Sequence, residues 1–176
     1  MLRTLSKPLL ALFLIDRAYT KGPATKGDYF HTLKWAEVTN GDINETSSYH
    51  VLFNILKKNN IKVSLFIDPK IKNVEQALKL NADNIELHTG TYCNLLNNKN
   101  KKKINLEFEK IKKTAVYAKK NNLGVHCGHG LNYLSAKKLK KIKEILEFNI
   151  GHFIISDSIF FGLTKVIKNF TKIIKN

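Results

Sequence analysis

Four short apolar segments recur along the chain, each ending in polar or glycine residues and each followed by helical spacing. They span residues 63–69 (VSLFIDP), 85–90 (IELHTG), 124–133 (GVHCGHGLNY) and 149–155 (NIGHFII). Alternating strands and helices are typical of a parallel sheet whose strand ends carry the chemistry. We therefore predict an α/β fold of repeated βα units with right-handed crossovers.

Hydrophobic spacing sets the expected elements, and residues 17–45 and 97–103 are expected to be irregular. Asn105 and Ser135 are the expected caps of two helices. The expected strands cover 9–15, 61–67, 84–88, 123–127 and 150–155. The expected helices cover 47–59, 74–80, 105–121, a stretch from 135 with Leu139, Ile142 and Leu146 as its apolar stripe, and a last one over 163–174.

The length and glycine pattern narrow the fold further. The chain has 176 residues, whereas a complete eightfold βα barrel usually needs about 250. A barrel built from this sequence would therefore be a shortened one. No Gly-x-Gly-x-x-Gly leads from a strand into a helix, which disfavours a dinucleotide-binding fold.

The chain is strongly basic, with a formal net charge of +16. Solvated surface lysines are the simpler explanation, and the charge gives only weak support to binding of anions such as phosphorylated metabolites. No nucleic-acid-binding motif accompanies the lysines, so a basic nucleic-acid-binding protein is the weakest alternative.

Cysteine usage and hydropathy point to a reducing cytoplasm. Cys93 and Cys127 form no Cys-x-x-Cys pair, which disfavours a disulfide framework or a zinc knuckle. No apolar run approaches the 18 residues that suggest a membrane span. Residues 8–15 resemble a signal peptide, but Asp16 and Arg17 follow without a cleavage pattern, and a buried strand explains the run better.

The strand over residues 84–88 carries two candidate acid–base groups. Side chains alternate along a strand, so Ile85 and Leu87 share one face while Glu86 and His88 share the other. A carboxylate and an imidazole pointing into a barrel are costly unless they are paired or used. They form either a structural pair or part of an acid–base or substrate-binding site.

His129 is the clearest candidate for proton transfer. It lies between Gly128 and Gly130 at a strand end, where glycines let a ligand approach the backbone. An imidazole there can move protons near neutral pH, although an ordinary turn with an incidental histidine is the alternative. His126 is expected to face the helix layer or to pack locally, and we assign it no role.

The segment around Gly151 and His152 is a candidate phosphate site. Loops after the late strands of βα barrels commonly bind phosphate through glycine amides. A metal site is not expected, because no pair among His88, His126, His129 and His152 has helical i, i+4 spacing and no aspartate–histidine pair flanks them.

Together, the four segments resemble the pyridoxine 5'-phosphate synthase family. The matching stretches are 63–68, 86–90, 128–133 and 149–152 with Gly162 and Leu163, in the same order and spacing. The resemblance covers residue 61 to the carboxyl terminus and extends less securely to Glu37. It implies a cytoplasmic, oligomeric TIM barrel without metal or organic cofactor.

The resemblance also implies a reaction and its residues. The family condenses 1-deoxy-D-xylulose 5-phosphate with 3-amino-2-oxopropyl phosphate to pyridoxine 5'-phosphate, phosphate and water. It implies that His129 donates a proton and that Glu86 belongs to the active-site carboxylates. The implied substrate and phosphate ligands are Gly130, Gly151, His152, Thr39 and Asp16.

The first third of the chain departs from the family pattern. Only Ile15-Asp16 matches the first-strand motif, and the second-strand histidine and third-strand glutamate have no counterpart. Asp157 replaces an arginine after the last strand. We therefore expect residues 1–36 to be a poorly matched segment and residues 37–176 to supply the carboxyl-terminal units of a barrel lacking about two βα units. The alternative function is a catalytically impaired remnant that only binds phosphorylated ligands.

Overall fold

The fold is a six-stranded mixed sheet with helices packed mainly on one side. The computed structural model describes residues 9–13, 37–39, 53–97 and 101–175. The strand order is β2-β1-β3-β4-β5-β6. The strands are β1 (Leu9–Phe13), β2 (Glu37–Thr39), β3 (Ser64–Ile67), β4 (Asn84–His88), β5 (Gly124–Gly128) and β6 (Glu147–Asn149). The last four are parallel, whereas β1 is antiparallel to both β2 and β3.

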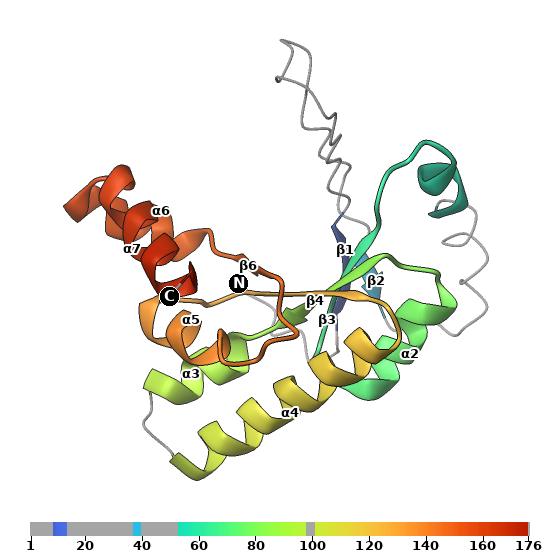
Figure 1. Cartoon of the computed structure of the whole chain (residues 1–176), viewed down its shortest axis with the longest axis horizontal. Helices are drawn as coiled ribbons and strands as arrows, with labels where there is room; N and C mark the ends of the chain where they lie inside the picture. Colours follow the sequence, from blue (N-terminus) through green and yellow to red (C-terminus); the bar gives the residue numbers. More distant parts are fainter. Residues whose placement is uncertain (1–8, 14–36, 40–52, 98–100, 176) are drawn as a thin grey trace.

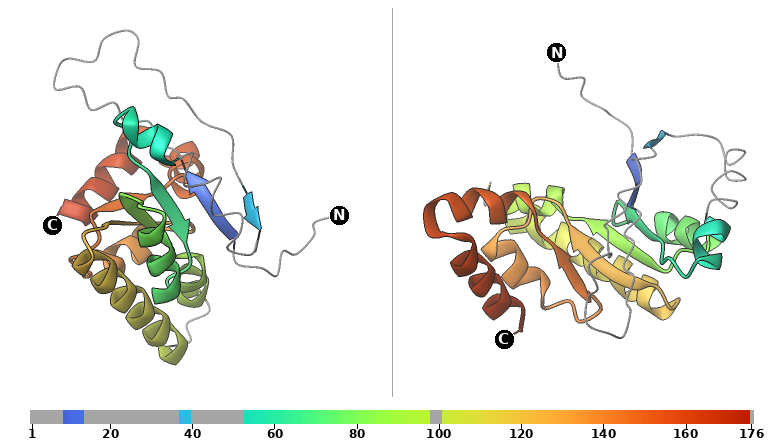
Figure 2. Two further views of the ribbon diagram at one scale, coloured as in Figure 1. Left: turned by 90° about the vertical axis from the view of Figure 1, so that its right-hand side faces the viewer. Right: turned by 90° about the horizontal axis from the view of Figure 1, so that it is seen from above.

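Helices follow most of the parallel strands. Residues 53–58 are helical before β3. The others are α2 (Ile71–Lys79), α3 (Gly90–Asn97), α4 (Lys101–Lys120), α5 (Tyr133–Leu139), α6 (His152–Phe161) and α7 (Leu163–Lys175). Helices α2 to α5 lie on one side of the strands, and α6 and α7 lie together at the β6 end of the sheet (Figures 1 and 2). This is the predicted α/β alternation.

The main core lies between the parallel strands and the helix layer. Ile85 pairs in register with Leu65 and Val125, and Leu87 pairs with Ile67 and Cys127. All six side chains are buried. Because strand side chains alternate, Glu86 and His88 lie on the opposite face, as the sequence predicts. The helix-facing side therefore supplies the apolar stability, and the other side is left for polar groups.

The predicted strand over residues 150–155 is wrong. The sixth strand covers Glu147–Asn149, and α6 begins at His152. Phe153 and Ile154 pack instead against a second cluster centred on Val166 and Phe170 of α7. Helical spacing places both side chains toward α7, which a strand could not do for two successive residues.

Two helix starts also differ from the prediction. Helix α4 begins at Lys101, so residues 101–103 are helical and Asn105 lies inside the helix rather than capping it. The N-cap of α5 is Asn132, whose side chain accepts the amide of Ser135 at 2.9 Å while Ser135 Oγ accepts the Asn132 amide at 2.8 Å. This reciprocal capping box explains why the helix starts before Ser135. It ends at Leu139, which leaves Leu146 of the predicted stripe exposed.

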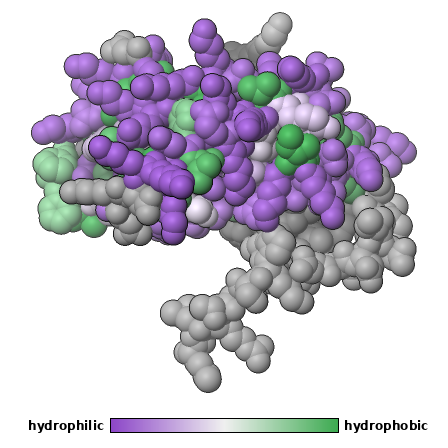
Figure 3. Space-filling model, turned by 90° about the horizontal axis from the view of Figure 1, so that it is seen from below, coloured by the Kyte–Doolittle hydropathy of each residue, from purple (hydrophilic) through white to green (hydrophobic). Residues whose placement is uncertain are grey.

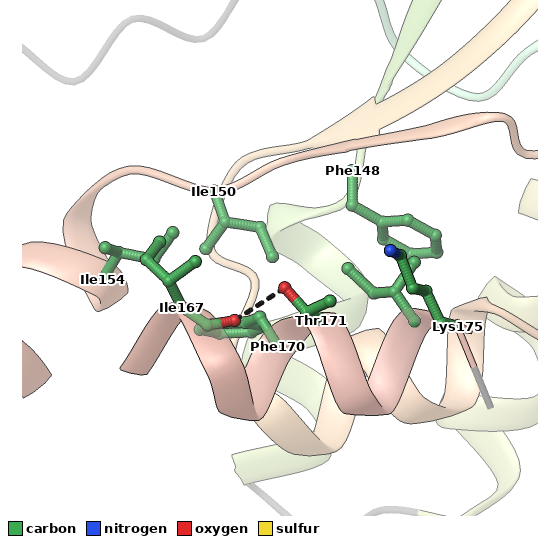
Figure 4. Close-up of a pocket in the computed structure, with 8 residues that line it drawn as sticks. Phe148, Ile150, Ile154, Ile167, Phe170, Thr171 and Lys175 are labelled. Carbon is green, nitrogen blue, oxygen red and sulfur yellow. Dashed lines mark hydrogen bonds between the residues drawn. The ribbon is translucent and has the colours of Figure 1, made fainter. Parts of the chain in front are cut away.

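The β6 end of the molecule is apolar and open. None of the residues of α6 is buried, although most of them are apolar. A groove of about 250 Å³ lies between Phe148 and Ile150 on one side and Ile167 and Phe170 of α7 on the other (Figure 4). It holds no titratable group except Lys175 at its end. This groove is a packing feature and is distinct from the polar strand ends described below.

The outer face of the helix layer, which points away from the sheet, is strongly hydrophilic. Figure 3 views the molecule from below, and most of that surface is hydrophilic with only isolated apolar residues. Helix α4 contributes many of the lysines, with Lys101, Lys102, Lys112 and Lys113 all exposed. Among the helices that the structure describes, none is long and apolar enough to cross a membrane.

Candidate active site

The candidate site lies where the parallel strands end. Asp68 follows β3, His88 ends β4, and His129 follows β5. Parallel strands place their carboxyl ends at one edge of a sheet, so three residues far apart in sequence come together there. This is the location that the sequence predicts for the chemistry.

Three aromatic rings meet at this edge. The centroids of the His88 and His129 rings are 4.7 Å apart, with an interplanar angle of 47°. Phe66 meets His88 edge-on, at 5.3 Å and 87°. The Nδ1 atom of His88 lies 3.7 Å from Oδ1 of Asp68. His88 is therefore enclosed by a ring, a carboxylate and a second imidazole.

The loop that carries His129 is held in an unusual backbone conformation. His129 has φ of 74° and Gly130 has φ of 76°. A non-glycine residue in this region costs about 1–3 kcal/mol, and such residues cluster at functional sites. The Thr89 hydroxyl donates to the carbonyls of Gly128 at 2.7 Å and His129 at 2.9 Å, and the Thr89 amide also donates to Gly128. Thr89 thus fixes the loop from the neighbouring strand.

Gly90 provides the space for the two imidazoles. A Cβ atom at this position would lie 2.7 Å from Cδ2 of His129 and 2.9 Å from Nε2 of His88. Both distances are shorter than real Cβ contacts, so any larger residue would displace a ring. Glycine is therefore required at position 90 because it lacks a side chain, and not because the backbone has a positive φ.

Glu86 lies on the polar face of the sheet, one layer below the histidines. Its side chain is largely buried, and Asn149 of β6 donates an Nδ2–H to its Oε2 at 2.5 Å. The carboxylate lies over the backbone of Gly128, where a Cβ would collide with it. Burial raises the pKa of Glu86, the Asn149 hydrogen bond opposes this, and nearby Glu147 raises the pKa further.

The expectation that His126 faces the helix layer is wrong. His126 pairs in register with Glu86 and Glu147, whereas its neighbours Val125 and Cys127 are the residues buried beneath the helices. His126 therefore lies on the polar face of the sheet, half-buried, in the same row as Glu86. Alternation along β5, together with its register with β4, fixes this orientation.

The proposed phosphate ligands lie at the same edge, where His129 and Gly130 are exposed as well. Gly151 and His152 are both exposed, Gly151 is the N-cap of α6, and no atom lies within 4 Å of a Cβ built on it. Thr39 ends β2, which runs in the same direction as β3 because both are antiparallel to β1. Asp16 lies outside the described residues.

Burial and charge set the protonation of His88. Burial lowers its pKa, and the neighbouring His129 lowers it further, whereas Asp68 and Glu107 act in the opposite direction. Lys110, which pairs with Glu107 at 3.1 Å, adds a small lowering effect. His88 is therefore predominantly neutral at neutral pH, so that the two imidazoles do not compete as two positive charges.

The arrangement is suited to proton transfer. It presents two imidazoles at the strand ends and, one layer below them, a carboxyl group of raised pKa; these are the groups used for general acid–base catalysis near neutral pH. Among the residues that the structure describes, no three His, Cys, Asp or Glu side chains are grouped as metal ligands would be. Cys93 and Cys127 are both free and buried.

The sequence matches one family along most of its length. The family model for "Pyridoxal phosphate biosynthesis protein PdxJ" matches residues 39–176. That match covers β3 to α7 and every strand-end residue described above. The chain belongs to this family.

Individual relatives agree with the family match. A pyridoxine 5'-phosphate synthase from Sulfurihydrogenibium is 45% identical over 121 residues, covering 69% of this chain and 48% of the relative. One from Pelagibacter ubique is 47% identical over 122 residues, covering 69% and 50%. One from Ehrlichia chaffeensis is 38% identical over 139 residues, covering 77% and 55%. The chain thus spans about half the length of these family members.

Three residues contribute to the site although the sequence did not predict them as site residues. Asp68 stood out only as the residue that stops a strand, and its contact with His88 depends on the pairing of β3 with β4. Asn149 belongs to a recognised segment, yet its bond to Glu86 spans two strands. Gly90 could have been found, since a glycine directly after a polar strand end is a signal of close approach.

Proposed function

We propose that this chain carries the carboxyl-terminal part of a pyridoxine 5'-phosphate synthase active site. The reaction is the condensation of 1-deoxy-D-xylulose 5-phosphate with 3-amino-2-oxopropyl phosphate, releasing phosphate and water. The observation that supports this most directly is His129, held in a strained loop against His88 at the carboxyl edge of the sheet. Family membership and the names of the relatives support this reaction.

Specific roles follow from the position of each group. His129 donates a proton to the leaving oxygen. Glu86 is the active-site carboxyl group that stabilises charge that develops on the substrate. Its raised pKa brings it closer to the range in which a carboxyl group can exchange protons. Gly130, Gly151 and His152 hold substrate or phosphate, helped by the amino end of α6. Thr39 and Asp16 are proposed as further substrate ligands.

We further propose that the parallel strands belong to a shortened TIM barrel. The row of Phe66, Glu86, His126 and Glu147, which pair in register, would then point to the barrel interior. In a closed barrel this row would be enclosed, whereas here several of its members are half-exposed. Pairing with a second copy, as a homo-oligomer in the cytoplasm, would supply cover for the row.

A second function is a protein that binds phosphorylated ligands without rapid turnover. The observation that favours it is the absence from this sequence of counterparts to the second-strand histidine and third-strand glutamate. A condensation that moves several protons needs more than one acid–base group. Under this alternative, the proposed phosphate-binding residues still bind phosphorylated ligands, although the condensation is slow.

Formation of pyridoxine 5'-phosphate from the two purified substrates tests the proposal. The chain is expected to form product more slowly than a full-length family member assayed beside it. The His129→Ala variant is expected to lower that rate by a further factor of about 10² or more, the usual contribution of a general acid. The His152→Ala variant is the matched control, because it should raise KM more than it lowers kcat.

The outcomes separate the two functions. Measurable turnover that depends on His129 supports the synthase assignment. No turnover, together with phosphate-dependent thermal stabilisation, favours the binding protein. Turnover that is unchanged in His129→Ala contradicts the role of His129, and turnover equal to that of the full-length relative contradicts the inferred loss of catalytic groups.

A further inference from the structure

A triad of side chains at the strand ends is only partly explained by the proposed roles. His88 contacts both Asp68 and His129, yet neither His88 nor Asp68 has been given a part in the reaction. Each of the three comes from a different parallel strand or from the loop that follows it. Their meeting is therefore a property of the sheet and not of one local turn.

The backbone alone does not determine where the His129 imidazole points. Thr89 fixes the carbonyls on either side of the His129 nitrogen, and the φ of 74° fixes the Cα–Cβ direction. Rotation about χ1 and χ2 remains. The ring of His88, 4.7 Å away, and the Cα of Gly90 border the volume that the imidazole can occupy. His88 thus limits the positions that are open to the exposed His129 ring.

His88 is itself held from several directions. Phe66 meets its ring edge-on, and Gly90 lies beside its Nε2 and Cε1 atoms. Asp68 lies beside its Nδ1 atom. Asp68 is anchored in turn, because Lys70 Nζ binds its other carboxylate oxygen at 3.1 Å and Asn73 donates to its carbonyl at 3.3 Å. A chain of contacts therefore runs from the start of α2 to His129.

We propose that His88, oriented by Asp68, is a positioning residue that sets the orientation and the charge environment of His129. The inference rests on the proposed function of His129 as a proton donor, and it concerns residues that act through His129. A carboxylate beside Nδ1 favours the tautomer with its proton on that nitrogen, which leaves Nε2 as an acceptor. His88 then presents its ring nitrogens to His129 in one fixed tautomer.

The charged groups around His88 make the proposal measurable without substrate. Asp68 faces it from the loop after β3, His129 from the loop after β5, and Glu107 and Lys110 act from α4. Titration of His88 therefore reports whether Asp68 and His129 act on this ring.

The first experiment follows the His88 ring by NMR over a pH series in the full chain. Asp68→Asn should lower the pKa of His88, and His129→Asn should raise it, each by at least ~0.5 pH unit for unit charges about 5 Å apart in a water-like environment. Glu109→Gln is the matched control, since it also removes one carboxylate but from an exposed position on α4. It should leave the titration of His88 unchanged.

The second experiment measures steady-state kinetics. His88→Ala should lower kcat by about 10- to 100-fold with little change in KM, because misplacement of a catalytic group by about 1 Å costs up to about 10²-fold. His88→Phe keeps a ring against Phe66 but loses the contact with Asp68. It should restore kcat only in part, and Asp68→Asn should resemble it.

The two experiments fail in different ways. If neither Asp68→Asn nor His129→Asn changes the measured pKa of His88, the positioning role is overturned, whatever the activity. Full recovery of kcat in His88→Phe also overturns it, by showing that only ring volume matters. Coupled titration in a chain without turnover keeps the positioning role and removes the proposed synthase function. Unchanged backbone spectra in each variant confirm that the protein is folded.

Discussion

Gly128 offers a sharp test of the packing between the sheet backbone and the Glu86 carboxylate. A Cβ at Gly128 would collide with Oε1 of Glu86 and would lie 2.9 Å from its Cδ and 3.2 Å from Cβ of Asn149. Gly128→Ala therefore forces the carboxylate away from Asn149. The residue has no positive φ, so backbone strain does not contribute.

The cost can be estimated from two losses. A hydrogen bond to a charged group contributes about 1.5–3 kcal/mol, and the one between Asn149 and Glu86 would be broken or lengthened. Overpacking of a filled site costs about 1–3 kcal/mol. Gly128→Ala should thus lower the free energy of unfolding by about 2.5–6 kcal/mol. For a domain of this size, the melting temperature should fall by roughly 5–24 °C.

A double-mutant cycle measured by urea denaturation isolates the cause. In a Glu86→Ala background the colliding atoms are gone, and Gly128→Ala should cost no more than about 1 kcal/mol, since only the Asn149 contact remains. The expected coupling energy is at least about 1.5 kcal/mol. Equal costs in the two backgrounds would refute the reasoning, as would a cost below about 0.5 kcal/mol in the wild-type background.

Three other predictions follow from the site. Because burial raises the pKa of Glu86, its ionised form costs stability as pH rises through that pKa, so Glu86→Gln should raise the melting temperature more at pH 8 than at pH 4 while it lowers activity. The pKa of His88 is lowered from 6.5, so the stability that its neutral form contributes is lost on acidification; His88→Phe should therefore flatten the dependence of urea midpoint on pH between 7 and 5. Inorganic phosphate should raise the melting temperature of the wild-type chain, and Gly151→Val should abolish the rise by blocking its amide, whereas an unchanged shift would argue against that site.

Strand periodicity predicted the part of the site that lies within β4. The alternation of Ile85 and Leu87 with Glu86 and His88 is a local pattern, and the structure follows it. Along β5 the same alternation puts His126 on one face of the strand, but it does not say which face the helices cover. Register with β4, which pairs His126 with Glu86, decides this, and for that reason the prediction for His126 was wrong.

Contacts between strands could not be predicted in the same way. Asn149 reaches Glu86 across β5, and Asp68 reaches His88 across the β3–β4 pair. The end of β6 was misplaced because Phe153, Ile154 and Ile155 form an apolar run that is compatible with either a strand or a helix. Packing of Phe153 against Phe170, at 5.8 Å between ring centroids, decides the matter in favour of the helix.

Register links the stability of the fold to the geometry of the site. At the amino ends of the strands, the Asp83 carboxylate accepts the amide of Val63 at 2.8 Å, and the carbonyl of Val63 accepts the amides of Asp83 and Asn84. These bonds hold β3 and β4 in the one register that places Phe66 beside Glu86.

A slip of one residue would turn Leu87 toward the polar face and Glu86 toward the helix layer. The apolar core excludes that slip, because Ile85 and Leu87 of β4 would both leave it together. The residues that stabilise the fold therefore alternate with those that form the site, so the same register that buries the core also brings Asp68, His88 and His129 together.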